Sequence, residues 1–189
     1  MDVLSTLLST FIMIFLAELG DKSQLACMSL ASTGKHKNVL WGATCAFLVL
    51  NTIAVGFGLK LSLWIPEYYL ALGMTTLFSM FALAFLYSAL RRHKDEDVSE
   101  LNVPTTFTSI FIFIFVAELG DKTQIATTGL ASTYSIFIVW LGASLALFCS
   151  TLLAVYVGAR WLANIPIKTL HFVCAGIFAT FAFMQALSI

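Results

Sequence analysis

The sequence predicts an all-α integral membrane fold in which six transmembrane helices form two inverted three-helix repeats. Of its 189 residues, 60% are hydrophobic and 11% are charged, and the mean hydropathy is +0.95. Soluble domains are typically about half apolar and a quarter charged. Six apolar segments each approach the roughly 20 residues that cross a bilayer. The second half also repeats the first without a gap, about 100 residues later.

The six apolar segments fall into two halves joined by a polar linker. We expect spans at about 4–33, 39–59, 68–90, 105–133, 135–159 and 169 to the C-terminus. The first repeat therefore covers residues 1–90 and the second covers residues 105–189. The linker, residues 91–104, is rich in charges of both signs and ends at a proline, before which helices usually stop.

The first segment of each half contains the same charged phrase. It reads ELGDKSQ at 18–24 and ELGDKTQ at 118–124. Its third residue, Gly20 or Gly120, weakens a helix, so we expect the first helix of each repeat to be interrupted or kinked. Irregular backbone at membrane depth is tolerated only where protein or water surrounds it. Both phrases should therefore face the interior of the bundle.

The number of spans per half determines the orientation of the two halves. Three is an odd number, so the second half enters the membrane from the opposite side, as in many secondary transporters. One side would then carry Lys35, Lys37, Arg91, Arg92, Lys94, Arg160 and Lys168, and the other would carry Lys60. The positive-inside rule predicts that the first side, with the linker, is cytoplasmic and that both termini are outside.

The two phrases are the candidate functional site, because ionisable residues at membrane depth mark such sites by default. On a helix, residues three apart share a face. We therefore predict that carboxylates from both halves bind one metal ion; these are Glu18, Asp21, Glu118 and Asp121. Supporting positions or further possible ligands are Gln24, Gln124, Ser23, Thr123, Lys22 and Lys122. Each phrase carries a net charge of minus one, so two phrases balance a divalent cation.

The chemistry of the phrases favours a hard cation. Carboxylate, amide and hydroxyl oxygens suit Ca²⁺, Mg²⁺ and Mn²⁺, and the four cysteines lack metal-site spacing. Crowded acids in a low dielectric also take up protons readily when no cation is bound. Exchange of a cation for protons follows, although coupling to Na⁺ stays open.

Other interpretations remain open from these residues. Glu18 with Lys22, and Glu118 with Lys122, have the spacing of structural ion pairs, as in a membrane assembly protein that transports nothing. A catalytic acid dyad and a passive channel are further alternatives. Polar residues of the second segment of each half are expected to make hydrogen bonds between helices; these are Asn51, Thr52, Ser150 and Thr151. The net charge of zero gives no argument for nucleic acid as a partner.

The doubled phrase resembles that of the small divalent-cation/proton exchangers, the family of the Golgi manganese and calcium transporters. The resemblance covers essentially the whole chain, including the charged linker, and neither phrase departs from the family pattern. It implies a six-helix inverted repeat with a cation site between the phrases. It also carries the roles of ligand or proton carrier onto Glu18, Asp21, Glu118 and Asp121.

The bacterial branch of this family resembles manganese exporters, and this compact chain looks like a member of that branch. The resemblance implies a transporter, not an enzyme, that exports Mn²⁺ in exchange for protons and holds no cofactor. Ca²⁺/H⁺ exchange is the alternative. The expected partners are the metal ion, protons and lipid, and the oligomeric state is open. We expect a multi-pass protein of the bacterial inner membrane with periplasmic termini, whose first apolar segment is too long for a cleaved signal peptide.

Overall fold

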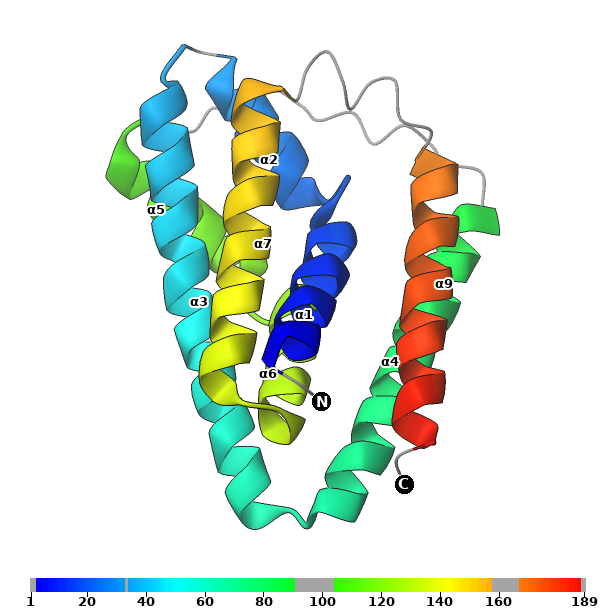
Figure 1. The fold of residues 1–189 in the computed structure, drawn as a ribbon. Coiled ribbons are helices and arrows are strands. Elements are labelled where there is room, and N and C mark those ends of the chain that lie inside the picture. The colour runs from blue at the N-terminus through cyan, green and yellow to red at the C-terminus, as the bar shows by residue number, and fades with distance from the viewer. Residues whose placement is uncertain (1–2, 33, 91–103, 158–166, 188–189) are drawn as a thin grey trace.

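The computed structural model describes residues 3–32, 34–90, 104–157 and 167–187, and these residues form helices without a strand (Figure 1). The helices are α1 (Val3–Glu18), α2 (Lys22–Ala31), α3 (His36–Trp64), α4 (Glu67–Leu90), α5 (Phe107–Glu118), α6 (Lys122–Thr133), α7 (Ile136–Tyr156) and α9 (Ile167–Ala186). The prediction of an all-helical chain is therefore confirmed for the described residues. The charged linker lies almost entirely outside them.

The helix boundaries follow the predicted apolar segments. The first segment of each half is divided in two, into α1 and α2 and into α5 and α6, and each division falls within a charged phrase. The predicted interruption is thus present in both halves. The axes of α1 and α2 differ by 70°. Gly20 and Gly120 provide the breaks with φ angles of 76° and 82°, a left-handed conformation that glycine adopts without steric cost.

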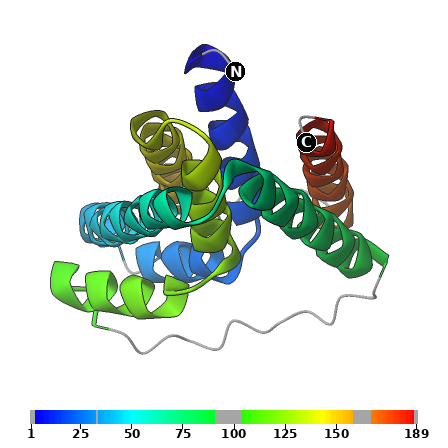
Figure 2. The ribbon, with the colours of Figure 1, turned by 90° about the horizontal axis from the view of Figure 1, so that it is seen from below.

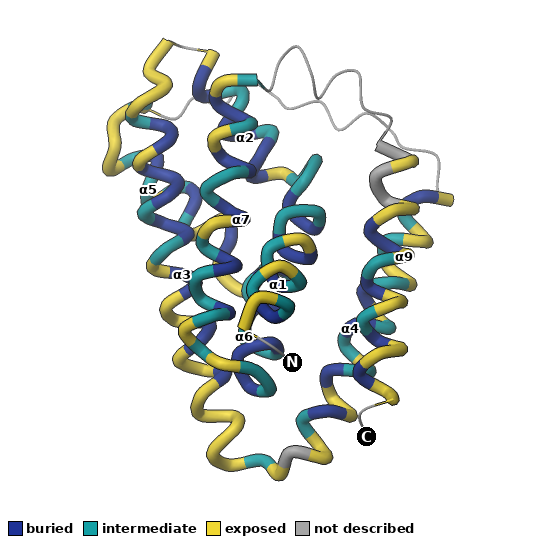
Figure 3. Tube along the Cα trace, viewed as in Figure 1, coloured by how far each residue is buried: buried dark blue, intermediate teal, exposed yellow. Residues whose placement is uncertain are grey.

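Several helices have the length and apolar character that a membrane span requires. Among the described residues these are α3, the Tyr68–Leu90 part of α4, and α7, and the bent pair α1–α2 would make a fourth span. Large apolar side chains point outward along the bundle; Leu83, Val116 and Phe137 are each 66% exposed. Figure 3 shows such exposed positions along the outer faces of the helices. Lipid, not water, is the solvent that accepts this surface.

The helices form a main bundle and a separate arm (Figures 1 and 2). In the bundle, α3 lies beside α7, and the broken helices pack around this pair. The arm is the antiparallel pair α4–α9. Its two helices are joined by aromatic contacts, because Phe78, Phe81 and Phe85 of α4 lie 6.0, 5.5 and 5.5 Å from the ring of Phe178 in α9.

Both helices of the arm contact the broken helices of the bundle. The Cys174 thiol of α9 donates a hydrogen bond of 3.2 Å to the carbonyl of Leu16 in α1. On the other helix of the arm, Met74 fills the space beside Gly129 of α6. The arm therefore contacts α1 from the first half and α6 from the second.

One contact in the bundle is made twice, at positions that differ by 100. An added Cβ at Gly42 of α3 would lie 3.0 Å from the carbonyl oxygen of Phe107 in α5. At Gly142 of α7 it would lie 3.0 Å from the carbonyl oxygen of Leu7 in α1. Small residues at such crossings let helix backbones approach closely in a membrane protein. The corresponding helices of the two halves therefore pack in the same way.

A substitution at Gly58, where the backbones of α3 and α6 approach closely, tests the packing of these two helices. An added Cβ at Gly58 would lie 2.6 Å from the carbonyl oxygen of Thr128 and 2.7 Å from the Cβ of Ala131. We expect Gly58→Ala to lower the free energy of unfolding by about 1–3 kcal/mol because the backbones must separate. Unfolding in detergent measures this change.

Gly56 of the same helix supplies the matched control, since an added Cβ there meets no atom within 4 Å. Gly56→Ala should leave stability unchanged or raise it by up to about 1 kcal/mol through helix propensity. Equal stabilities for the two variants would contradict the close approach at Gly58.

Candidate metal centre

The breaks present two aspartates at helix starts without using their side chains as caps. Asp21 and Asp121 immediately precede α2 and α6 with extended backbones, and neither side chain makes a capping hydrogen bond. Aspartate at this position usually accepts a hydrogen bond from the first turn. Here each carboxylate remains available to other partners, near the positive end of a helix dipole.

A glutamine side chain forms a hydrogen bond to the backbone at each break. Gln24 Oε1 accepts a hydrogen bond of 2.6 Å from the backbone N–H of Gly20. Gln124 Oε1 accepts the equivalent bond of 2.5 Å from Gly120. Each glutamine amide therefore stabilises the break, because it accepts a hydrogen bond from a backbone N–H that the interrupted helix leaves without a partner.

The same two glutamines connect each break to the opposite half of the chain. Gln24 Nε2 donates to Ser150 of α7, at 3.0 Å to the hydroxyl and 3.5 Å to the carbonyl. Gln124 Nε2 donates to the carbonyl of Leu50 in α3 at 3.5 Å. Positions 50 and 150 correspond in the repeat, so equivalent hydrogen bonds connect each half to the other.

Three of the four predicted metal ligands come together between the halves. One carboxylate oxygen from each of Glu18, Asp21 and Glu118 lies within 4.8 Å of the others. Glu18 and Glu118 are only 2% and 5% exposed. Oxygens on opposite sides of a Mg²⁺ or Ca²⁺ ion, at metal–oxygen distances of about 2.0–2.6 Å, are about 4–5 Å apart. The cluster therefore has the dimensions of a site for one hard cation.

Several carboxylate oxygens of the two phrases are buried without a hydrogen-bond partner. They are Glu18 Oε2, Glu118 Oε2 and Asp121 Oδ2. Buried polar atoms are normally paired because their desolvation is costly. A cation or a proton would satisfy these oxygens. The other oxygen of Glu18 accepts a hydrogen bond from the Ser23 hydroxyl.

The remaining predicted residues occupy different positions around the cluster. Asp121 lies outside the group of three carboxylates, although one of its oxygens is buried. Thr123, two residues after Asp121, is buried, whereas Lys22 is exposed. The roles of all ten phrase residues in metal binding stay predictions.

An ion pair joins the two phrases in a way that the spacing did not predict. Lys122 Nζ lies 2.8 Å from Asp21 Oδ2. The sequence had suggested a pair between Lys122 and Glu118 within one phrase. The lysine instead reaches the other half of the site, where it also lies 5.7 Å from the ring centre of Phe85. Phe85 carries no sequence signal, since it is one phenylalanine among 17.

Polar residues of α3 and α7 form hydrogen bonds between helices. Asn51 donates to the Ser144 hydroxyl at 3.2 Å, and Trp140 donates to the Thr52 hydroxyl at 3.1 Å. With the Gln24–Ser150 bond, they confirm the predicted bonds between helices for three residues. The prediction is wrong for Thr151, whose hydroxyl bonds to Leu147 one turn earlier in α7.

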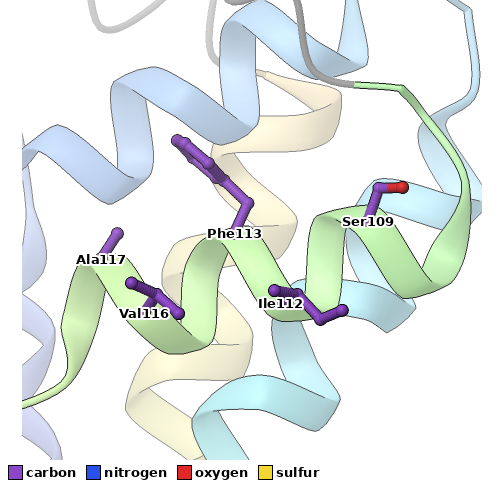
Figure 4. Close-up of a pocket in the computed structure, with 5 residues that line it drawn as sticks. All are labelled: Ser109, Ile112, Phe113, Val116 and Ala117. Carbon is purple, nitrogen blue, oxygen red and sulfur yellow. The ribbon is translucent and has the colours of Figure 1, made fainter.

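An apolar pocket lies on α5 (Figure 4). Its lining contains one hydroxyl and no charged side chain; the lining residues are Ser109, Ile112, Phe113, Val116 and Ala117. Such a surface offers a metal ion one hydroxyl and no carboxylate. The carboxylate cluster is therefore the candidate ion site.

Comparison with known proteins decides the family. A family model described as "Divalent cation/proton antiporter GDT1" matches residues 6–93 and 106–188, which include both charged phrases. The chain belongs to the GDT1 family. The resemblance seen in the sequence is thus confirmed, and with its apolar helices the chain is a multi-pass membrane protein of a transporter family.

Relatives that match nearly the whole chain support this assignment. A GDT1-like protein 3 of Arabidopsis thaliana is 29% identical over 96% of this chain and 70% of its own length. A Vibrio cholerae protein named "Putative manganese exporter" is 29% identical over 97% of this chain and 92% of its own length. A GDT1-like protein of Synechocystis is 27% identical, covering 95% of this chain and 96% of itself. No solved structure matches the chain.

Gly120 tests whether the break depends on backbone conformation alone. An added Cβ at Gly120 meets no atom within 4 Å, but the residue has a φ of +82°. We expect Gly120→Ala to lower the free energy of unfolding by about 1–2 kcal/mol, the cost of a left-handed conformation for other residues. Unfolding in detergent measures the loss.

Gly73 of α4 is the control for this substitution, because its added Cβ also meets no atom and its φ is not left-handed. Gly73→Ala should be neutral or stabilising. A Gly120 variant as stable as the Gly73 variant would show that the break does not require a left-handed residue.

Proposed function

We propose that this protein is a secondary active transporter that exports a divalent cation, foremost Mn²⁺, from the cytoplasm in exchange for protons. The observation that carries the proposal is the convergence of Glu18, Asp21 and Glu118 from both halves of the chain. Membership of the GDT1 family supports cation/proton exchange as the reaction. The name of the Vibrio relative supports Mn²⁺ as the ion.

Two inverted repeats provide the architecture for this function. Each broken helix pair, α1–α2 and α5–α6, counts as one span, and together with α3, α4, α7 and α9 they make six. The equivalent glycine contacts and glutamine bonds of the two halves support this arrangement. Inverted repeats that enclose a central site alternate its access between the two sides of a membrane.

The proposed orientation places the protein in the bacterial inner membrane with both termini in the periplasm. The start of α1 and the end of α9 lie toward the same end of the molecule in Figure 1. Lys35 and Lys37 lie at the opposite end, at the start of α3. Lysine-rich short loops mark the cytoplasmic side, so that end faces the cytoplasm.

Proton coupling follows from the buried oxygens that have no partner. When a divalent ion leaves, Glu18, Glu118 and Asp121 retain carboxylate oxygens that are removed from water. Two protons restore the charge that the ion supplied, so protonation makes the empty site tolerable in the membrane. Glu18 and Glu118 are the proposed proton carriers as well as metal ligands.

Neutralising one carboxylate tests the site directly. Glu18→Gln keeps the shape of the side chain but removes its charge and its exchangeable proton. We expect Mn²⁺-dependent proton flux to fall below detection while the protein still inserts into membranes. Proteoliposomes with an internal pH dye measure the flux.

Glu96→Gln is the matched control, because it makes the same change in the charged linker of the sequence. It should exchange Mn²⁺ for H⁺ at the rate of the original protein. Normal exchange by the Glu18 variant would refute the site assignment. Absence of flux in the unaltered purified protein would favour the assembly-protein alternative instead.

A competition assay separates Mn²⁺ from Ca²⁺. Both ions accept an all-oxygen site, so the cluster alone does not separate them. In proteoliposomes we expect unlabelled Mn²⁺ to suppress labelled Mn²⁺ transport at lower concentration than Ca²⁺ or Mg²⁺. Suppression by Ca²⁺ at equal or lower concentration would make the protein a Ca²⁺/H⁺ antiporter.

A further inference from the structure

One lysine connects three separate parts of the molecule. Lys122 begins α6, and its ammonium group lies 2.8 Å from Asp21 Oδ2, which precedes α2 in the other half. The same group lies 5.7 Å from the ring centre of Phe85, on α4 of the arm. The candidate metal centre and the arm thus share a single cationic side chain.

The ammonium group of Lys122 forms an ion pair with a carboxylate that also belongs to the metal cluster. Asp21 contributes to the cluster with Glu18 and Glu118, and it is the partner of Lys122. Two cations within a few Å of each other repel strongly where water does not screen them. A divalent ion at the cluster and Lys122 at Asp21 therefore compete for the same charge.

The ring beneath Lys122 belongs to the aromatic core of the arm. Phe85 is stacked on Phe178 of α9, with ring centres 5.5 Å apart and planes within 18°. An ammonium over an aromatic face is attracted to it, and more strongly when both are removed from water. Movement of Lys122 away from Asp21 would change a contact that bears on both helices of the arm.

The position equivalent to Phe85 in the other half carries no aromatic ring. The position that corresponds to Phe85 is Gln185, whose side-chain oxygen accepts a hydrogen bond of 2.9 Å from the Tyr134 hydroxyl. An amide in place of an aromatic ring offers no cation–π partner. The link between site and arm therefore belongs to Lys122 and not equally to Lys22.

We propose that Lys122 is a positioning residue that serves as the built-in counter-ion of the empty site and transmits metal binding to the arm. A divalent cation at Glu18, Asp21 and Glu118 displaces the ammonium group from Asp21, and the displaced group leaves Phe85. This inference rests on the proposed function, because it assigns a role within the same site.

The first test asks whether Lys122 and a divalent ion compete for Asp21. Calorimetry measures the binding of Mn²⁺ to the purified full-length protein. Lys122→Gln removes the competing charge, so we expect Mn²⁺ to bind at least about tenfold more tightly. Lys122→Arg keeps the charge and should bind Mn²⁺ as the original protein does. Lys22→Gln makes the same change in the other phrase and should tighten binding less. If Lys122→Gln does not fold, Lys122→Met, which also lacks the charge, replaces it.

The second test asks whether metal binding is transmitted to the arm, and it measures transport in proteoliposomes. Phe85→Leu should lower the maximal rate of Mn²⁺/H⁺ exchange at least about tenfold while the Mn²⁺ dissociation constant changes less than about threefold. Phe85→Tyr keeps the ring and should restore the rate. Phe81→Leu is the matched control, since Phe81 also lies 5.5 Å from Phe178 but is not the ring beneath Lys122.

The outcomes separate this inference from the proposed function. Weaker Mn²⁺ binding by Lys122→Gln, or equal tightening by Lys22→Gln, would overturn the role of counter-ion. Equal rates for the Phe85→Leu and Phe81→Leu variants would overturn transmission to the arm. If the original protein binds no Mn²⁺, the proposed function itself fails.

Discussion

The cost of burying carboxylates at membrane depth governs the structure of this protein. Glu18 and Glu118 are almost completely buried, and each has an oxygen without a hydrogen-bond partner. Such groups are expensive in a membrane protein unless a charge or a proton compensates them. The broken helices, the lysine that crosses between the phrases and the close helix contacts all serve to bring compensating groups to this point.

The backbone break makes that compensation possible. An unbroken helix would satisfy its own peptide groups and would place Asp21 on its side. At the start of α2, Asp21 instead stands at a helix end without capping it, and Gln24 accepts a hydrogen bond from the N–H of Gly20. The hydrogen bond to the broken backbone and the charge at the site thus come from two different side chains, a division of roles between Gln24 and Asp21. The second phrase repeats this division with Asp121 and Gln124.

The fold was predictable from the sequence where the signal is local. Runs of apolar residues indicated the spans, and glycine within a charged phrase indicated each break, because both effects act over a few neighbouring residues. The convergence of Glu18, Asp21 and Glu118 also followed from the internal repeat. Local composition and the internal repeat can both be identified in a single sequence without any knowledge of tertiary contacts.

The partners of individual side chains were not predictable in the same way. Lys122 has a suitable acid four residues earlier, yet its partner is Asp21 on another helix. The position of Asp121 outside the cluster likewise breaks the equivalence of two nearly identical phrases. A symmetric sequence pattern predicts symmetric roles, whereas packing against a single arm makes the environments of the two phrases unequal.

The difference between Phe85 and Gln185 has an energetic consequence for the proposed inverted repeats. Two identical halves would give the inward-open and outward-open states equal free energy, since exchanging the halves converts one state into the other. Any preference for one resting orientation must therefore originate at positions where the halves differ. Phe85 lies under the lysine that pairs with the metal centre, and Gln185 lies in a hydrogen bond to Tyr134. This pair of positions is one place where the halves differ and where such a preference can originate.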